Sequence, residues 1–146
     1  MALPTYQPKR VFIGRLKHGA DLLQELTRIV NEENIRTGSI SGIGGLIRGA
    51  VAFYNQQTKQ YERIELNESL EITSLAGNVS IFKQRSFPHA HITLSDKQGR
   101  AFGGHLTQGC EIWACEVVIQ ELEGGTLTRE FDETTGLPLW KDSSIL

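Results

Sequence analysis

The chain has 146 residues, of which 39% are hydrophobic and 22% are charged, and its formal net charge is -2. This composition is typical of a folded globular domain and excludes a mainly disordered chain. It also argues against a nucleic-acid binder, because such proteins generally need a basic surface to displace counterions from phosphates. No apolar run approaches the roughly 18 residues of a membrane helix, and residues 1–10 lack the apolar core of a signal peptide, so we expect a cytoplasmic protein with no membrane contact.

The first third of the chain predicts one strand and one helix. A short strand is expected over Val11–Leu16. The segment Ala20–Glu33 predicts a helix because its apolar residues recur at the spacing of a single helical stripe. These residues are Leu22, Leu23, Leu26, Ile29 and Val30.

From Thr37 onwards the apolar pattern changes to a period of two, which is typical of strands. The expected strands are Thr37–Ile43, Ile47–Tyr54, Tyr61–Leu66, Ser69–Ser74, Asn78–Arg85, His89–Ser95, Arg100–Leu106, Glu111–Leu122 and Thr126–Phe131. Gly42–Gly45 is interpreted as a turn between the first two, since no phosphate-loop lysine follows it. One helix among many short strands predicts an α+β fold: a single domain with a mainly antiparallel multi-stranded sheet.

The histidines are the most informative residues of the chain. Three of the four, His89, His91 and His105, lie within seventeen residues. Side chains alternate along a strand, so His89 and His91 share one face, and the apolar residues between and after them occupy the other.

The position of His105 depends on the hairpin that joins the two strands. A three-residue loop, Lys97–Gly99, with Gly99 in the left-handed conformation, pairs Asp96 with Arg100. That register places His91 opposite His105 and His89 opposite Thr107, whereas a two-residue loop would turn His105 towards the core. The apolar residues Phe102 and Leu106 support the first register, because it places them on the core side. The glycines at 103 and 104 are expected to leave open space beside the rings.

Three converging imidazoles predict a metal site, because neutral imidazole is the commonest metal ligand and three histidines with an open fourth position resemble catalytic zinc sites. Zinc is the expected ion, with another divalent transition metal as the alternative. The fourth ligand would be water, a small-molecule ligand or a residue of another subunit, and Glu111 and Glu116 are candidates to support the site. The competing interpretation is three histidines that make ordinary hydrogen bonds.

The cysteines are expected to be structural. Cys110 and Cys115 are five residues apart, a spacing that places them on opposite faces of one strand, where they could neither pair nor share a metal. We therefore interpret both cysteines as small, buried apolar side chains of a protein in a reducing compartment.

The segment His-x-His-x-x-Leu-x-Asp-x-x-Gly at 89–99, followed by Gly-Gly-His-Leu at 103–106 and preceded by Glu-Ile-Thr-Ser-Leu-Ala-Gly-Asn-Val-Ser at 71–80, resembles the PPC (plant and prokaryote conserved) domain of the prokaryotic stand-alone type. The resemblance runs from Val11 to Leu122. It implies a single PPC-like domain over 1–146, with a core at 11–122 and a C-terminal extension at 123–146. It also implies a homotrimer in which His89, His91 and His105 hold a metal, zinc being expected.

These observations support three hypotheses of function. The first is a stand-alone trimeric metal-binding protein of unassigned activity, with a small-molecule ligand at the metal and no catalytic residue identified. The second is a DNA-associated regulatory or architectural protein; the chain lacks the Arg-Gly-Arg-Pro core of an AT-hook, for which Pro8-Lys9-Arg10 is a poor substitute. The third is a trimeric interaction scaffold with a structural metal. In the extension, Thr135-Gly136 predicts a turn, and the apolar residues after it are expected to pack on this sheet or on a neighbouring subunit.

Overall fold

The computed structural model describes residues 4–141. It contains one helix and nine strands within that range, with the following bounds: β1 Gln7–Arg15, α1 Leu22–Glu32, β2 Gly38–Asn55, β3 Gln60–Leu66, β4 Leu70–Phe82, β5 Arg85–Ser95, β6 Ala101–Leu106, β7 Glu111–Glu123, β8 Arg129–Asp132 and β9 Leu137–Trp140. The predicted mainly antiparallel sheet with one helix is confirmed, and strands account for most of the regular structure. No helix in the described part of the chain is long and apolar enough to cross a bilayer.

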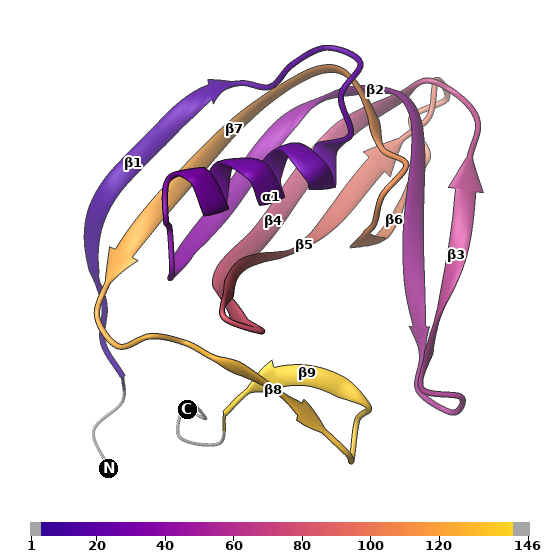
Figure 1. The fold of residues 1–146 in the computed structure, drawn as a ribbon. Coiled ribbons are helices and arrows are strands. Elements are labelled where there is room, and N and C mark those ends of the chain that lie inside the picture. The colour runs from indigo at the N-terminus through magenta and orange to yellow at the C-terminus, as the bar shows by residue number, and fades with distance from the viewer. Residues whose placement is uncertain (1–3, 142–146) are drawn as a thin grey trace.

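The main sheet curves so strongly that its last strand, β6, also pairs with the central strand β2. Its strands follow the order β1-β7-β2-β4-β5-β6, and all of its pairings are antiparallel. β2 has 18 residues, so its first part pairs with β4 and β7 while its last part pairs with β3 and β6. The strands β2, β4, β5 and β6 therefore form a closed ring. In Figure 1 the sheet arches around α1, and the small β8–β9 hairpin lies below the arch.

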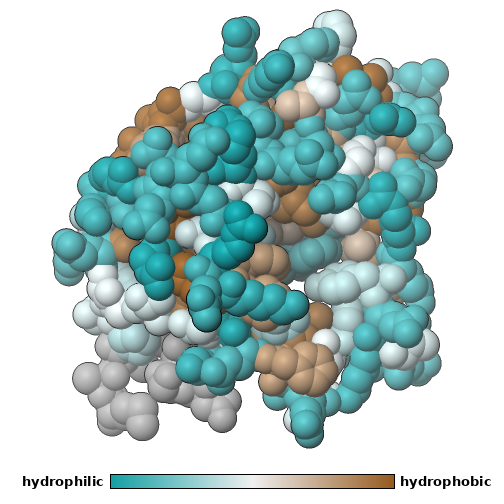
Figure 2. Space-filling model, viewed as in Figure 1, coloured by the Kyte–Doolittle hydropathy of each residue, from teal (hydrophilic) through white to brown (hydrophobic). Residues whose placement is uncertain are grey.

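The helix α1 covers one side of this sheet as its apolar stripe predicts. Leu22, Leu26 and Val30 are fully buried against the core. Figure 2 shows mostly hydrophilic residues over the helix in this view, as expected for a helix with one buried face. The helix begins after Asp21, whose Oδ1 accepts a hydrogen bond from the Gln24 N–H at 2.9 Å.

Asp21→Ala is expected to lower the free energy of unfolding by about 1–2 kcal/mol, the usual range for loss of a helix cap. Besides capping α1, the Asp21 carboxylate accepts a 2.6 Å hydrogen bond from the Gly109 N–H, so alanine leaves two backbone donors without this partner. Urea unfolding measures the change. Asp21→Asn is the control because it keeps one side-chain oxygen; a loss as large as that of alanine would contradict the capping role.

Two of the expected turns are absent from the described structure. Gly42–Gly45 lies inside β2, where β7 runs so close that a Cβ on Gly44 would be 2.1 Å from the Ala114 carbonyl oxygen. The glycines therefore permit close strand packing rather than a corner. Likewise, the strands expected at 69–74 and 78–85 form one strand, β4, which ends at a turn where Lys83 and Gln84 have φ angles of 48° and 65°.

The two cysteines are free and buried, as expected, but they do not point to opposite faces. Both belong to the same hydrophobic core. Cys110 precedes β7, and inside β7 the pairing with β2 shifts register beside Trp113, so that Ile112 and Cys115 both point inward. The predicted alternation was wrong because a bulge interrupts the period of two.

The C-terminal segment forms a separate two-stranded hairpin rather than a last strand of the sheet. The strand expected at Thr126–Phe131 begins later, at Arg129. The predicted turn at Thr135-Gly136 is confirmed: Gly136 has a φ angle of 75°, and its N–H donates to the Asp132 carbonyl at 2.7 Å. The Tyr54 hydroxyl donates to the Thr135 carbonyl at 2.6 Å, which ties the hairpin tip to β2.

Candidate metal centre

The β5–β6 hairpin has the register that the sequence predicts. His91 pairs with His105, Gly99 has a φ angle of 77°, and its N–H donates to the Asp96 carbonyl at 2.9 Å. One detail differs: β6 ends at Leu106, so Thr107 does not pair with His89, whose ladder partner is Asn78 of β4. The three histidines consequently share the sheet face opposite the buried residues of β5.

The three imidazoles converge. One ring nitrogen from each of His89, His91 and His105 lies within 4.8 Å of the others. The ring centroids are 5.2–5.6 Å apart. Tyr61 of β3 lies against the His105 ring with centroids 4.7 Å apart, so a strand distant in sequence closes one side of the cluster. Among residues 4–141, these three histidines form the one group of at least three potential ligands that lie close enough together to hold a single metal ion.

A side chain at either glycine beside the cluster would meet neighbouring backbone, although Gly104 does line the open space beside the rings. A Cβ on Gly103 would lie 2.1 Å from the Ile92 carbonyl oxygen, and one on Gly104 would lie 2.8 Å from the Ala52 carbonyl oxygen. Neighbouring backbone already occupies those positions. Their role is to let β6 lie close to β5 and β2, and this close packing fixes the distance between His91 and His105.

The open space lies between the sheet and the C-terminal hairpin. A cavity of about 510 Å³ has the histidine cluster in its wall. Its lining consists of residues from β2, β3, β5, β6 and the hairpin: Ala52, Phe53, Tyr54, Gln56, Tyr61, Phe87, His89, His91, Gly104, His105, Arg129, Leu137, Pro138 and Leu139. Leu137 and Leu139 of the apolar tail line the same cavity as the histidines of this sheet, and Leu139 is 38% exposed. Packing of the tail on a neighbouring subunit stays a prediction.

Arg129 is the site residue that sequence reasoning missed. Its guanidinium donates to Ser80 Oγ at 2.8 Å, to Asn78 Oδ1 at 3.0 Å and to the Pro138 carbonyl at 3.0 Å, and it approaches His89 Nδ1 at 3.4 Å. It also stacks between two aromatic rings, those of Phe87 and Trp140. No local signal marks Arg129, because the residues through which it reaches the cluster, on β4 and β5, are some 40 to 50 positions away in sequence.

The histidine protonation favours a metal ligand role. Burial, reinforced by the nearby Arg129 guanidinium, lowers the pKa of His89 from 6.5 to about 4. Burial also lowers the pKa of His105, and the charge of the nearby His91 ring is a second, smaller cause. Both rings are therefore neutral at physiological pH, and each has one unprotonated nitrogen, which in His89 is the nitrogen in contact with Arg129. His105 Nδ1 is buried without a hydrogen-bond partner among the described residues, and coordination of a metal ion would satisfy such an atom.

The metal-free protein is expected to lose stability as the pH falls from 6.5 towards 4. The folded state holds His89 neutral down to about pH 4, whereas the unfolded chain takes up this proton near pH 6.5. The unfolded state therefore binds more protons in this window, and stability rises with pH. Urea unfolding of chelator-treated protein at pH 7 and pH 5 measures the slope. His89→Gln should flatten it, and a slope identical to that of the native chain would contradict the assignment.

The other residues considered for the site lie elsewhere. The Glu111 carboxylate pairs with Arg48 at 2.9 Å, and Glu116 lines a different depression, with Ile13 and Ile43. His18 contacts the Trp113 carbonyl oxygen through Nδ1 at 2.8 Å. Neither glutamate supports the histidine cluster, so those two predictions were wrong. The fourth histidine, His18, lies in the loop between β1 and α1.

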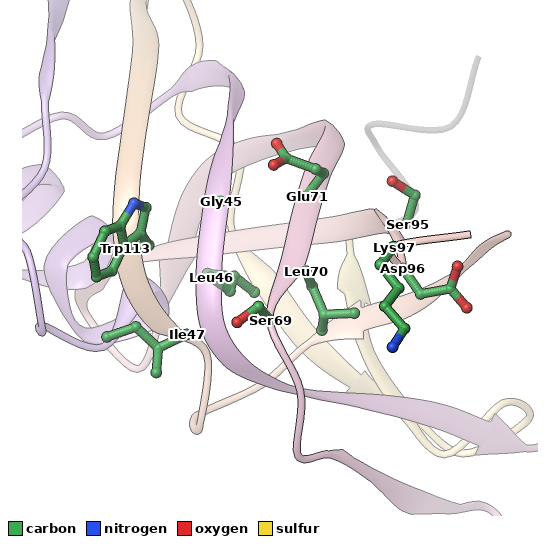
Figure 3. Close-up of a pocket in the computed structure, with 10 residues that line it drawn as sticks. All are labelled: Gly45, Leu46, Ile47, Ser69, Leu70, Glu71, Ser95, Asp96, Lys97 and Trp113. Carbon is green, nitrogen blue, oxygen red and sulfur yellow. The ribbon is translucent and has the colours of Figure 1, made fainter. Parts of the chain in front are cut away.

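A second cavity, of about 480 Å³, is lined by residues of β2, β4, β5 and β7 and of the loop that follows β5. Figure 3 shows its lining, with Trp113 at one end and Asp96 and Lys97 at the other. Glu71 and Asp96 point in different directions, and the Asp96 carboxylate is already bound to Arg100 at 2.7 Å. Because its charged groups do not converge, this cavity offers no comparable chemistry.

The fold and site define a class of small β-rich protein: an arched sheet with one covering helix and an open three-histidine cluster beneath a C-terminal hairpin. Residues 4–123 match the model of the Plants and Prokaryotes Conserved (PCC) domain. The chain belongs to this family, which is the one that its histidine and glycine motifs resemble.

Solved structures agree with this assignment. The metal-containing protein from Archaeoglobus fulgidus is 38% identical with a TM-score of 0.90, over 97% of this chain and 100% of its own. The PPC protein of Pyrococcus horikoshii is 34% identical with a TM-score of 0.91, over 97% and 98% of the two chains. A protein of Bacteroides thetaiotaomicron provisionally described as DNA-binding is 27% identical with a TM-score of 0.85, over 94% and 98%.

A curated relative is much longer. The bifunctional protein GlmU of Synechococcus sp. (strain JA-3-3Ab) is 34% identical over 128 residues, which are 87% of this chain and 20% of that protein. The chain thus spans about a fifth of this relative.

Proposed function

We propose that this chain is a zinc-binding protein in which His89, His91 and His105 hold the ion and leave a coordination position open to the cavity. The observation that carries the proposal is the convergence of the three ring nitrogens within 4.8 Å, one ring having a buried nitrogen with no partner. Three neutral imidazoles suit zinc and other borderline divalent ions. The metal-containing description of the Archaeoglobus fulgidus relative supports the same conclusion.

The chemistry available at this site is that of an open metal position. A three-histidine zinc ion, when bound, acidifies a water or polarises a carbonyl or phosphoryl oxygen. The chain's own residues hold the ligand rings at fixed spacing and supply apolar walls, Leu137 and Leu139, on the hairpin side. No lining residue is positioned as a general base other than the histidines, so we assign no reaction.

Elemental analysis of untagged native protein tests the proposal. We expect about one zinc per chain, as three ligands for one ion require, and its loss in a His89→Ala/His91→Ala double variant. Native protein purified without any stoichiometric metal would contradict the proposal and leave the histidines as ordinary polar residues. The buried free thiols of Cys110 and Cys115 support a reducing, cytoplasmic setting.

The proposed assembly is a homotrimer. It is supported by apolar side chains that one copy leaves exposed on β1, β2 and β7, where Ile13 is 77% and Ile43 58% accessible and Val118 is also exposed. A patch of this kind is typical of an interface between subunits. Sedimentation equilibrium should give three times the chain mass, and a monomer at micromolar concentration would contradict the trimer.

Unfolding measurements separate a functional ion from a structural one. A ligand that binds only the folded state raises apparent stability, so zinc should raise the unfolding temperature in either case. For an open functional site, the zinc-free protein should remain folded and keep its assembly state. An unfolded or dissociated zinc-free protein would instead favour the scaffold with a structural metal.

The DNA-associated alternative is favoured by one observation, the description of the Bacteroides thetaiotaomicron relative. The net charge of -2 argues against it. Fluorescence anisotropy with a labelled duplex at low salt decides the matter: binding with a steep salt dependence would support a DNA role, and no binding would end it.

A further inference from the structure

The histidine cavity contains a positive charge, Arg129, for which no acidic partner is found among residues 4–141. Arg129 is only 8% exposed, and none of the residues that line the cavity is Asp or Glu. Within residues 4–141, Arg129 forms no ion pair; its four polar partners are a hydroxyl, an amide oxygen, a carbonyl and an imidazole, all neutral. A buried cation is normally paired, because burial of an isolated charge is costly.

The contact between Arg129 and His89 makes this charge relevant to the metal. A guanidinium has only donors, so the 3.4 Å contact requires His89 Nδ1 to accept. A neutral ring that accepts at Nδ1 carries its proton on Nε2, which leaves no free lone pair for an ion. His89 can therefore bind a metal only if its contact with Arg129 breaks. The guanidinium N–H of Arg129 is then free to donate elsewhere, and the divalent ion adds a second positive charge beside the guanidinium.

The rest of the cavity is mostly apolar, with Gln56 and two tyrosines as its other polar residues. Aromatic rings of Phe53, Tyr54 and Phe87 and the side chains of Leu137 and Leu139 contribute to its lining. A volume of about 510 Å³ lies within the range of small-molecule sites. A ligand that fits must therefore combine a negative end with an apolar body.

We propose that this cavity binds a small organic monocarboxylate, whose oxygens lie between Arg129 and the metal and whose apolar part packs against the C-terminal hairpin. The planar fork of a guanidinium matches carboxylate geometry. This inference rests on the proposed function, because the metal supplies the second positive charge. In this proposal the β8–β9 hairpin recognises the ligand, because it carries both Arg129 and the apolar residues Leu137 and Leu139.

Isothermal titration calorimetry with zinc-loaded protein tests the charge and the apolar body separately. Benzoate is expected to bind, and more tightly than acetate, which lacks the ring. Benzyl alcohol, which has the ring without the charge, should not bind measurably. Equal affinity for benzyl alcohol would overturn the anion requirement, equal affinity for acetate would overturn the apolar contact, and tighter binding of inorganic phosphate would overturn the choice of a carboxylate.

Arg129→Gln should weaken benzoate at least about tenfold, in line with the loss of one hydrogen bond to a charged group. Arg36→Gln is the matched control, because Arg36 is exposed and lies outside the cavity lining. Zinc content and unfolding temperature are measured for each variant. If Arg129→Gln does not fold, the comparison of benzoate with benzyl alcohol in the native chain still decides the proposal.

Failure of this inference can be told apart from failure of the proposed function. Native protein that holds zinc but does not bind benzoate overturns the inference alone. Protein that holds no metal overturns the proposed function, and the titration is then done on that protein, where the guanidinium charge persists. Benzoate binding that depends on Arg129 would still support an anion site, and its absence would overturn it.

Discussion

Replacing His105 with phenylalanine is expected to abolish tight zinc binding while leaving the metal-free fold at least as stable as that of the native chain. His105 contributes one of three converging nitrogens, so its loss should weaken zinc by more than the roughly 10–100-fold that removal of an outer-shell partner costs. Phenylalanine keeps a ring in place beside Tyr61, 4.7 Å away between centroids. It also removes a buried nitrogen that has no partner, and an atom of this kind typically costs about 1–3 kcal/mol.

The two readouts of this experiment separate a ligand from a structural residue. Zinc affinity is measured by competition with a chromophoric chelator, and stability by urea unfolding of chelator-treated protein. His18→Phe is the matched control: His18 is exposed and lies outside the cluster, so zinc affinity should not change, and stability should fall by no more than the roughly 0.5–1.5 kcal/mol of its contact with the Trp113 carbonyl. Unchanged zinc affinity in His105→Phe would remove this ring from the site.

Gly103→Ala is expected to lower both stability and zinc affinity. The added Cβ would lie 2.1 Å from the Ile92 carbonyl oxygen and 3.0 Å from the Thr93 Cα, and neither backbone atom can rotate away. The β5 and β6 strands must separate, at a cost of about 1–3 kcal/mol typical of overpacking. Because the same pairing holds His91 opposite His105, the separation also spreads the ligands.

The matched control is Gly14→Ala in β1, where no atom lies within 4 Å of the added Cβ. Its effect on the unfolding free energy should stay within about 0.5 kcal/mol, as for most surface substitutions. Urea unfolding and zinc titration of the two variants measure the difference. Equal behaviour of the two variants would show that the close approach of β5 and β6 does not limit either property.

The histidine hairpin could be predicted because its determinants are local. The left-handed Gly99 fixes the loop length, and the loop length fixes every pair from Ser95–Ala101 to His91–His105. The same holds for α1, whose cap and apolar stripe lie within one segment. In such elements, the spacing of the apolar side chains and the identity of the turn residues are enough to predict the local structure.

The remaining features depend on contacts between distant segments. Gly44 looks like a turn residue in isolation, and its actual role, to admit the Ala114 carbonyl, is visible only once β2 and β7 are paired. The bulge beside Trp113 disrupts an otherwise regular alternation in the same way. Arg129 reaches the cluster because the C-terminal hairpin folds back over the sheet, and no pattern around it indicates that path.

The two walls of the histidine cavity differ in how firmly they are held. One wall belongs to the ring that β2 closes by pairing with both β4 and β6, and the other is the separate β8–β9 hairpin. The strands that carry the histidines belong to a ring without a free edge, so these ligands cannot part unless the central sheet itself opens. The hairpin that carries Arg129 is a separate unit, held to the body by a bridge between Ile81 and Thr128, by its side-chain contacts and by its tip. Local opening of that small unit would expose the cavity at far lower free energy than unfolding of the ring. The chain thus combines a ligand set held in a closed ring with a covering hairpin that can open without breaking that ring.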